Sequence, residues 1–67
     1  MQTEILENGC IVEHTPEEGF IRVTVWKPDR SLSVTARRTQ EYIEHDPHYR
    51  IGIEEQAAGL LLHQDAN

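Results

Sequence analysis

The run from Phe20 to Trp26 constrains the fold most, because its residues strongly favour a β-strand. It is built from β-branched, aromatic and polar residues in alternation, the pattern of a half-buried strand. One face carries Ile21, Val23 and Val25, and the other carries Phe20, Arg22, Thr24 and Trp26. We expect the isoleucine and valine face to point into the core.

Turn signals flank this strand on both sides. The segment 15–19 contains Pro16 and Gly19 and predicts a loop. After the strand, Pro28 and Asp29 occupy the central positions that a type I turn favours. Apolar residues at 32, 34 and 36 then alternate with polar ones, which predicts another strand to about Thr35. A helix beginning at position 31 or 33 is the competing interpretation.

The N-terminal segment predicts a hairpin centred on Asn8 and Gly9. This dipeptide suits the two positive-φ positions of a type I′ turn, and apolar pairs lie on either side of it. The register of such a turn sets Leu6 opposite Ile11 and residue 5 opposite residue 12. It also sets Glu4 opposite Glu13, which carries a small electrostatic penalty.

The C-terminal half predicts helices with one extended interruption. Residues 36–45 are helix formers with a weakly apolar side, and Asp46–Pro47 ends that element. Tyr49, Ile51 and Ile53 alternate as in a strand, so we expect a short strand or extended segment over 49–52. A helix is expected from about 53 to 63, where apolar residues recur at helical spacing.

These elements predict an α+β fold: a small antiparallel β-meander of three to four strands, followed by one or two short helices packed on one face. We expect residues 1–67 to form a single small domain, because a chain this short builds only a thin core. Cys10 is the only cysteine, so an internal disulfide is excluded. A thin core and an open sheet edge also favour self-association, and we expect a homodimer.

The chain is acidic overall but has a basic middle segment. The net charge is −6, which argues against general affinity for nucleic acid or anionic membranes. Residues 20–38 nevertheless sum to +4, and the rest of the chain to −10. There is no membrane-length apolar run and no signal-peptide pattern at the N-terminus, so we expect a cytoplasmic protein without membrane contact.

No catalytic motif is present in the sequence. It contains neither a glycine-rich phosphate loop nor a GxSxG nucleophile elbow. The paired carboxylates, at 17–18 and 54–55, are adjacent residues whose side chains diverge in a strand or a helix. Cys10 has no neighbouring base or second thiol, so it is interpreted as a packed apolar residue. We therefore expect a protein that is not an enzyme and has no cofactor.

The histidines give the one candidate metal site. His45, Asp46 and His48 cluster within four residues, and Glu41 lies one helical turn before His45. A zinc site needs three or four converging ligands, so His14 or His63 would have to join the cluster. The alternative is a solvated helix end. A metal-dependent domain is the third functional hypothesis.

The basic and aromatic middle segment is the favoured candidate site. Aromatic residues and arginine are the residue types that anchor protein interfaces. The candidate partner-binding residues are Phe20, Arg22, Trp26, Lys27, Arg30, Arg37 and Arg38. They predict a non-enzymatic protein–protein interaction module, a small acidic regulator or inhibitor that docks on a larger protein. One alternative is a nucleic-acid-binding module on the same 20–38 surface. Another is that the C-terminal helix covers this face and makes Trp26 core.

Overall fold

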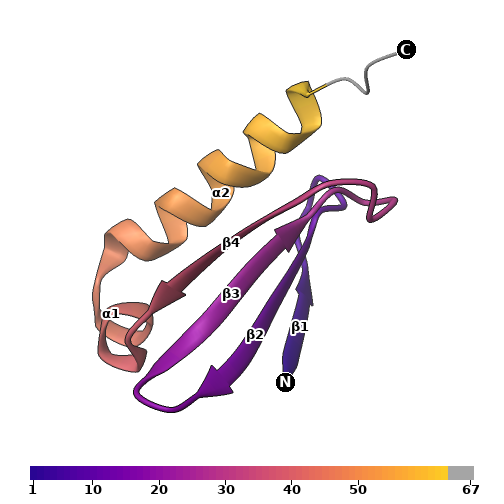
Figure 1. Ribbon diagram of the computed structural model, residues 1–67. Helices are drawn as coiled ribbons and strands as arrows, with labels where there is room; N and C mark the ends of the chain where they lie inside the picture. The colour runs from indigo at the N-terminus through magenta and orange to yellow at the C-terminus, as the bar shows by residue number, and fades with distance from the viewer. Residues whose placement is uncertain (64–67) are drawn as a thin grey trace.

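The computed structural model describes residues 1–63 and has four strands followed by two helices (Figure 1). The elements are β1 (Gln2–Ile5), β2 (Ile11–Glu17), β3 (Phe20–Trp26), β4 (Ser33–Arg38), α1 (Gln40–His45) and α2 (Pro47–Leu62). All neighbouring strands are antiparallel, and the sheet order is β1-β2-β3-β4. The predicted α+β fold, a small antiparallel meander followed by helices, is confirmed.

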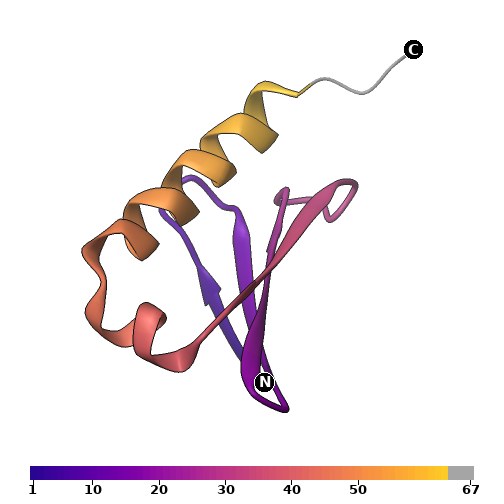
Figure 2. The same ribbon diagram turned by 60° about the vertical axis from the view of Figure 1, so that its left-hand side comes forward.

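The core lies between one face of the sheet and helix α2, which crosses that face (Figures 1 and 2). Both layers contribute side chains that repeat at the period of their element, every second residue in the strands and every third or fourth in the helix. The buried residues are Cys10, Val12, Val23, Val25, Tyr49, Ile53, Ala57 and Leu60. Val23 and Val25 bear out the predicted core face of β3, and Ile21 packs half-buried beside them.

The β1–β2 turn differs by one residue from the predicted hairpin. Ile5 pairs with Ile11, and Leu6 and Cys10 close a three-residue loop through a hydrogen bond of 2.9 Å from Leu6 N to Cys10 O. Only Gly9 takes a positive φ, +92°, while Asn8 does not. The Asn8 side chain instead accepts a hydrogen bond of 3.0 Å from Cys10 N. This is the type I turn with a glycine bulge, the next commonest hairpin loop after the type I′ turn.

This register resolves the clash expected between Glu4 and Glu13. Glu13 now pairs with Thr3, and a shift of one residue puts the two carboxylates on opposite faces of the sheet. On the helix side, Glu4 binds the guanidinium of Arg50 through contacts of 3.1 and 3.2 Å. This bidentate ion pair joins β1 to α2.

Strand β2 extends into the segment predicted as a loop. It continues through Pro16 to Glu17, and only Glu18 and Gly19 form the turn, with Gly19 at φ +81°. Proline is tolerated there because β1 pairs only with residues 11–14, so the missing N–H of Pro16 faces no strand.

The first helix begins later than predicted. Strand β4 continues through Arg38, and Thr39 starts α1 by accepting a hydrogen bond of 3.1 Å from Tyr42 N. A threonine side chain competes well for free amides at a helix start, so this cap sets the boundary between strand and helix.

The predicted extended segment at 49–52 is wrong, because α2 is one continuous helix. Asp46 caps it by accepting a hydrogen bond of 2.9 Å from His48 N, and Pro47 occupies the first turn. Tyr49 and Ile53 both lie on the buried face, whereas Ile51 points outward and is 53% exposed. The apparent alternation at 49–53 is therefore the start of a helical i, i+4 pattern.

Gly59 offers a test of this helix. It is exposed inside α2, and a Cβ added there would meet no atom within 4 Å. We expect Gly59→Ala to raise the free energy of unfolding by about 0.5–1 kcal/mol, because alanine loses less backbone entropy in a helix. The matched control is Gly19→Ala, which should lower it because φ is +81° there. Urea unfolding followed by Trp26 fluorescence measures both; a destabilised Gly59→Ala variant would contradict the helix at this position.

Strands β1 and β4 form the two edges of the sheet. Self-association through such an edge stays a prediction, and light scattering across a concentration series tests it, a concentration-independent monomer mass being the contrary result. Within residues 1–63, no helix combines the length and the apolar composition needed to cross a membrane.

Candidate functional site

The sheet face opposite α2 carries the aromatic residues of β3 and is the candidate site. We call it the open face. The pairing registers place on it Thr3, Ile5, Ile11, Glu13, Thr15, Glu17, Phe20, Arg22, Thr24, Trp26, Ser33, Thr35 and Arg37. Helix α2 covers the valine face instead (Figure 2). Trp26 is therefore half-buried on the open face, and the alternative in which it belongs to the core is wrong.

One end of the open face is organised around Trp26. Its indole Nε1–H donates a hydrogen bond of 2.8 Å to Glu13 Oε1. Arg30 lies over the ring, with its Cζ atom 5.3 Å from the ring centroid, and contacts Glu13 Oε2 at 3.3 Å. Across the sheet, Ile11 pairs with Trp26 and Ile5 with Ile11, and Ile5 is 70% exposed. This end combines apolar surface with a fixed indole.

The turn before β4 positions Arg30 over the indole. Arg30 has φ 62°, the one positive φ of a non-glycine residue within 1–63, and its N–H donates to Lys27 O at 2.8 Å. Asp29 supports the turn by accepting a hydrogen bond of 3.0 Å from Ser31 N, and hydrogen bonding to Ser31 lowers the pKa of its carboxyl. A left-handed arginine costs on the order of 1 kcal/mol, which its contacts with Trp26 and Glu13 offset.

The other end of the open face is organised around Phe20. Arg37 lies over its ring, with Cζ 5.1 Å from the centroid. Arg22 stands directly opposite Arg37 in the β3–β4 pairing and contacts Glu17 at 3.4 Å. One guanidinium thus lies over the aromatic ring, and a second comes from the residue paired with Arg37 and has a carboxylate beside it. The excess positive charge at this end suits an acidic ligand group.

A threonine pair separates the two ends. Thr24 Oγ1 and Thr35 Oγ1 lie 3.1 Å apart across β3 and β4. Trp26 and Arg22 are four residues apart on β3, which corresponds to about 13 Å at the usual rise of a strand. The open face therefore presents an apolar end and a cationic end at a defined separation.

The structure brings together five of the seven predicted partner-binding residues and separates two. Phe20, Arg22, Trp26, Arg30 and Arg37 meet on or beside the open face. On the opposite side, Lys27 Nζ donates to His63 O at 3.0 Å, and Arg38 lies over Tyr42 with Cζ 5.8 Å from the ring. The basic segment 20–38 is thus divided between the two sides of the sheet, because successive residues of β4 face opposite sides and the turn after β3 places Lys27 on the helix side.

Sequence reasoning missed Glu13 and Glu17, the two carboxylates of the open face. Both belong to β2, whose end was assigned to a loop and whose pairing with β1 was set one residue out of register. The spacing could have revealed them, because positions 11, 13, 15 and 17 of a strand share the face opposite the apolar Val12.

The histidine cluster forms two separate pairs. His48 Nδ1 lies 2.9 Å from Asp46 Oδ1, and His45 Nε2 lies 3.8 Å from Glu44 Oε1. The hydrogen bonds that Asp46 accepts from the backbone and side chain of His48 lower the pKa of its carboxyl. In the part of the chain that the structure describes, no three histidine, cysteine or acidic residues are placed to hold a metal ion.

The Cys10 thiol lies in the core. It is fully buried, and its Sγ atom is 3.7 Å from Ala57 O on α2. Burial raises the pKa of this thiol, so the nucleophilic thiolate is disfavoured. Cys10 packs the sheet against the helix.

His14 makes stability depend on pH. It hydrogen-bonds to the Tyr49 hydroxyl on the helix side, and burial lowers its pKa below 6.5, with Arg50 adding to the effect and Glu4 opposing it. The folded state thus binds fewer protons here than the unfolded state, so stability is lost as pH falls through 6.5 and below. We expect His14→Gln to reduce this loss in urea unfolding between pH 7.5 and 5.5. His45→Gln, at an exposed histidine, should keep it; an unchanged pH slope in His14→Gln would refute the assignment.

No protein-family model, curated protein or solved structure matches this chain.

Proposed function

We propose that this chain is a non-enzymatic protein-binding module that docks on a larger protein through its open face. The partner segment presents an apolar side chain to the Trp26 end and an acidic side chain to the Arg22 and Arg37 end. The observation that carries the proposal is the pair of aromatic rings, each stacked by an arginine, on a sheet face that neither described helix covers.

The Trp26 end has the properties of an interface anchor. Tryptophan and arginine contribute much of the binding energy at protein interfaces. An aromatic side chain contributes more binding free energy when its orientation is already fixed, because less entropy is lost on binding. Here Glu13 fixes the indole through Nε1, and Arg30 fixes it from above. The exposed Ile5 extends the apolar surface beside it. A partner that inserts an apolar side chain there loses little entropy in ordering the site.

Charge pairing favours a protein partner over nucleic acid. Of the three arginines on or beside the open face, Arg30 contacts Glu13 and Arg22 contacts Glu17. The face therefore keeps a net charge of about +1, whereas phosphate-driven binding needs several cations free to neutralise the backbone. One net positive charge beside aromatic surface fits a partner with a single carboxylate near an apolar anchor.

Selection from a displayed peptide library tests the proposal. We expect the peptides enriched on the wild-type chain to combine an apolar or aromatic residue with Asp or Glu. Arg37→Gln should weaken their binding at least about tenfold, since a charge-assisted hydrogen bond is lost. Arg38→Gln is the matched control, because it removes the same charge from the other face of β4 and should leave binding unchanged.

Two results would reject the proposed function. One is a set of enriched peptides whose binding ignores Arg37→Gln. The other is tight binding of a single-stranded oligonucleotide that weakens steeply with salt and depends on the open face, which would assign the surface to nucleic acid.

A further inference from the structure

A small cavity of about 40 Å3 lies on the helix side of the sheet, between β4, α1 and α2. Its floor is apolar and includes Val23 and Ile53. Its polar lining comes from three elements: Arg38 from β4, Tyr42 from α1, and His48, Tyr49 and Gln56 from α2. The cavity is separate from the open face, since the sheet lies between them.

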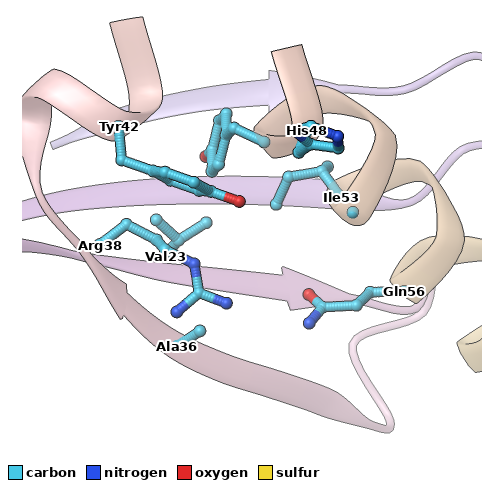
Figure 3. Close-up of a pocket in the computed structure, with 9 residues that line it drawn as sticks. Val23, Ala36, Arg38, Tyr42, His48, Ile53 and Gln56 are labelled. Carbon is cyan, nitrogen blue, oxygen red and sulfur yellow. The ribbon is translucent and has the colours of Figure 1, made fainter. Parts of the chain in front are cut away.

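Three polar groups surround this space. Figure 3 shows the guanidinium of Arg38 and the amide of Gln56 facing each other across a gap, with the ring and hydroxyl of Tyr42 above them. All three can donate hydrogen bonds. Within residues 1–63, no aspartate or glutamate lines the cavity and no carboxylate pairs with Arg38. One guanidinium nitrogen of Arg38 donates a hydrogen bond of 2.8 Å to Arg37 O, and the positive charge that remains has no carboxylate partner within residues 1–63.

We infer that this cavity binds a carboxylate group. The planar guanidinium matches the two oxygens of a carboxylate, and the hydroxyl and amide add neutral donors at its side. One guanidinium balances one negative charge, whereas a doubly charged phosphate would remain only partly neutralised. The apolar floor and the small volume admit a short alkyl stem behind the carboxylate.

Two sources supply this chemistry: a free short-chain carboxylic acid, or the side chain of Asp or Glu in a peptide. Titration of the isotope-labelled chain with sodium acetate, followed by amide and side-chain NMR shifts, tests the site. We expect saturable shifts at Arg38 and Gln56 with a dissociation constant on the order of 1–10 mM, as the small size of acetate allows. A peptide with blocked termini and a single Glu is titrated in parallel. The affinity is read from the Arg38 and Gln56 shifts alone, because the proposed function has the open face bind acidic peptides too. Binding at least about tenfold tighter than acetate assigns the source to a peptide, and any weaker binding assigns it to a free acid.

Variants separate this site from the open face. Arg38→Gln should weaken acetate binding at least about tenfold, through loss of the charge-assisted pair. Tyr42→Phe keeps the ring beneath Arg38 and removes only the hydroxyl donor, so it should weaken binding by less. Arg37→Gln is the control with the same charge change on the other face of β4, and it should leave the acetate-induced shifts at Arg38 and Gln56 as they are in the wild type.

The inference is overturned if acetate gives no saturable shift, if sodium chloride or phosphate at equal ionic strength gives the same or larger shifts, or if Arg38→Gln and Arg37→Gln weaken binding equally. None of these results bears on the peptide binding expected at the open face.

Discussion

Ile53→Ala is expected to lower the free energy of unfolding by about 3 kcal/mol, the usual cost of emptying a buried isoleucine site. Ile53 is 5% exposed and lies in the middle of the buried face of α2. A chain of this size has a total stability of roughly 3–10 kcal/mol, so one such cavity removes a large share of it. In urea unfolding followed by Trp26 fluorescence, the midpoint should fall by roughly 2 to 3 M.

Ile51→Ala is the matched control for this substitution. It removes the same atoms two residues earlier in α2, where the side chain is 53% exposed. We expect the free energy of unfolding to change by less than about 0.5 kcal/mol. Equal losses in the two variants would contradict a continuous helix that buries residue 53 and exposes residue 51.

Strand β3 could be predicted from sequence because its composition and its periodicity agree. Its alternation assigned Val23 and Val25 to the core, and both are buried. No long-range information was needed, since β-branched residues favour the extended backbone and the polar residues between them mark the other face.

The first hairpin could not be predicted in register, because its loop depends on contacts distant in sequence. Asn8 and Gly9 suit two loop types, and the choice follows from surroundings the local sequence does not contain. A Cβ at Gly9 would lie 3.3 Å from Pro28 Cγ, in the turn between β3 and β4. Glu4 meets Arg50 across 46 positions of sequence. Register and tertiary contacts are thus determined together.

The helices were misjudged where two periods fit the same residues. The spacing of Tyr49 and Ile53 fits both a strand and a helix. Ile51 between them favoured the strand, but it is an exposed residue of the helix, and single exposed apolar residues are common on protein surfaces. The caps at Thr39 and Asp46 carried the correct signal.

The residue types of β3 on the open face could be predicted from the sequence, but the full set of residues that share this face could not. The aromatic face of β3 followed from alternation, whereas the split of Arg37 and Arg38 between two faces required β4 to continue past residue 35. The carboxylates that neutralise part of the face came from β2, which was assigned partly to a loop. The charge of a sheet face therefore depends more on where each strand ends than on the net charge of a sequence segment.

Trp26→Ala is expected to weaken binding of the selected peptides by about 30-fold or more, equivalent to about 2 kcal/mol, because tryptophans at interface centres commonly contribute that much. Isothermal titration calorimetry measures the affinity. The variant should still fold, since Trp26 lies outside the buried cluster and Arg30 keeps its contact with Glu13. Far-ultraviolet circular dichroism verifies this.

Two further variants show which property of the indole matters. Trp26→Phe keeps a ring for Arg30 to stack on but removes the Nε1–H bond to Glu13, so we expect an intermediate affinity between those of the wild type and Trp26→Ala. Leu62→Ala truncates an apolar residue that is 83% exposed at the end of α2 and should leave affinity unchanged. If Trp26→Ala binds like the wild type, or Leu62→Ala weakens binding as strongly, the anchor does not lie on the open face, because apolar exposure alone then explains the contact.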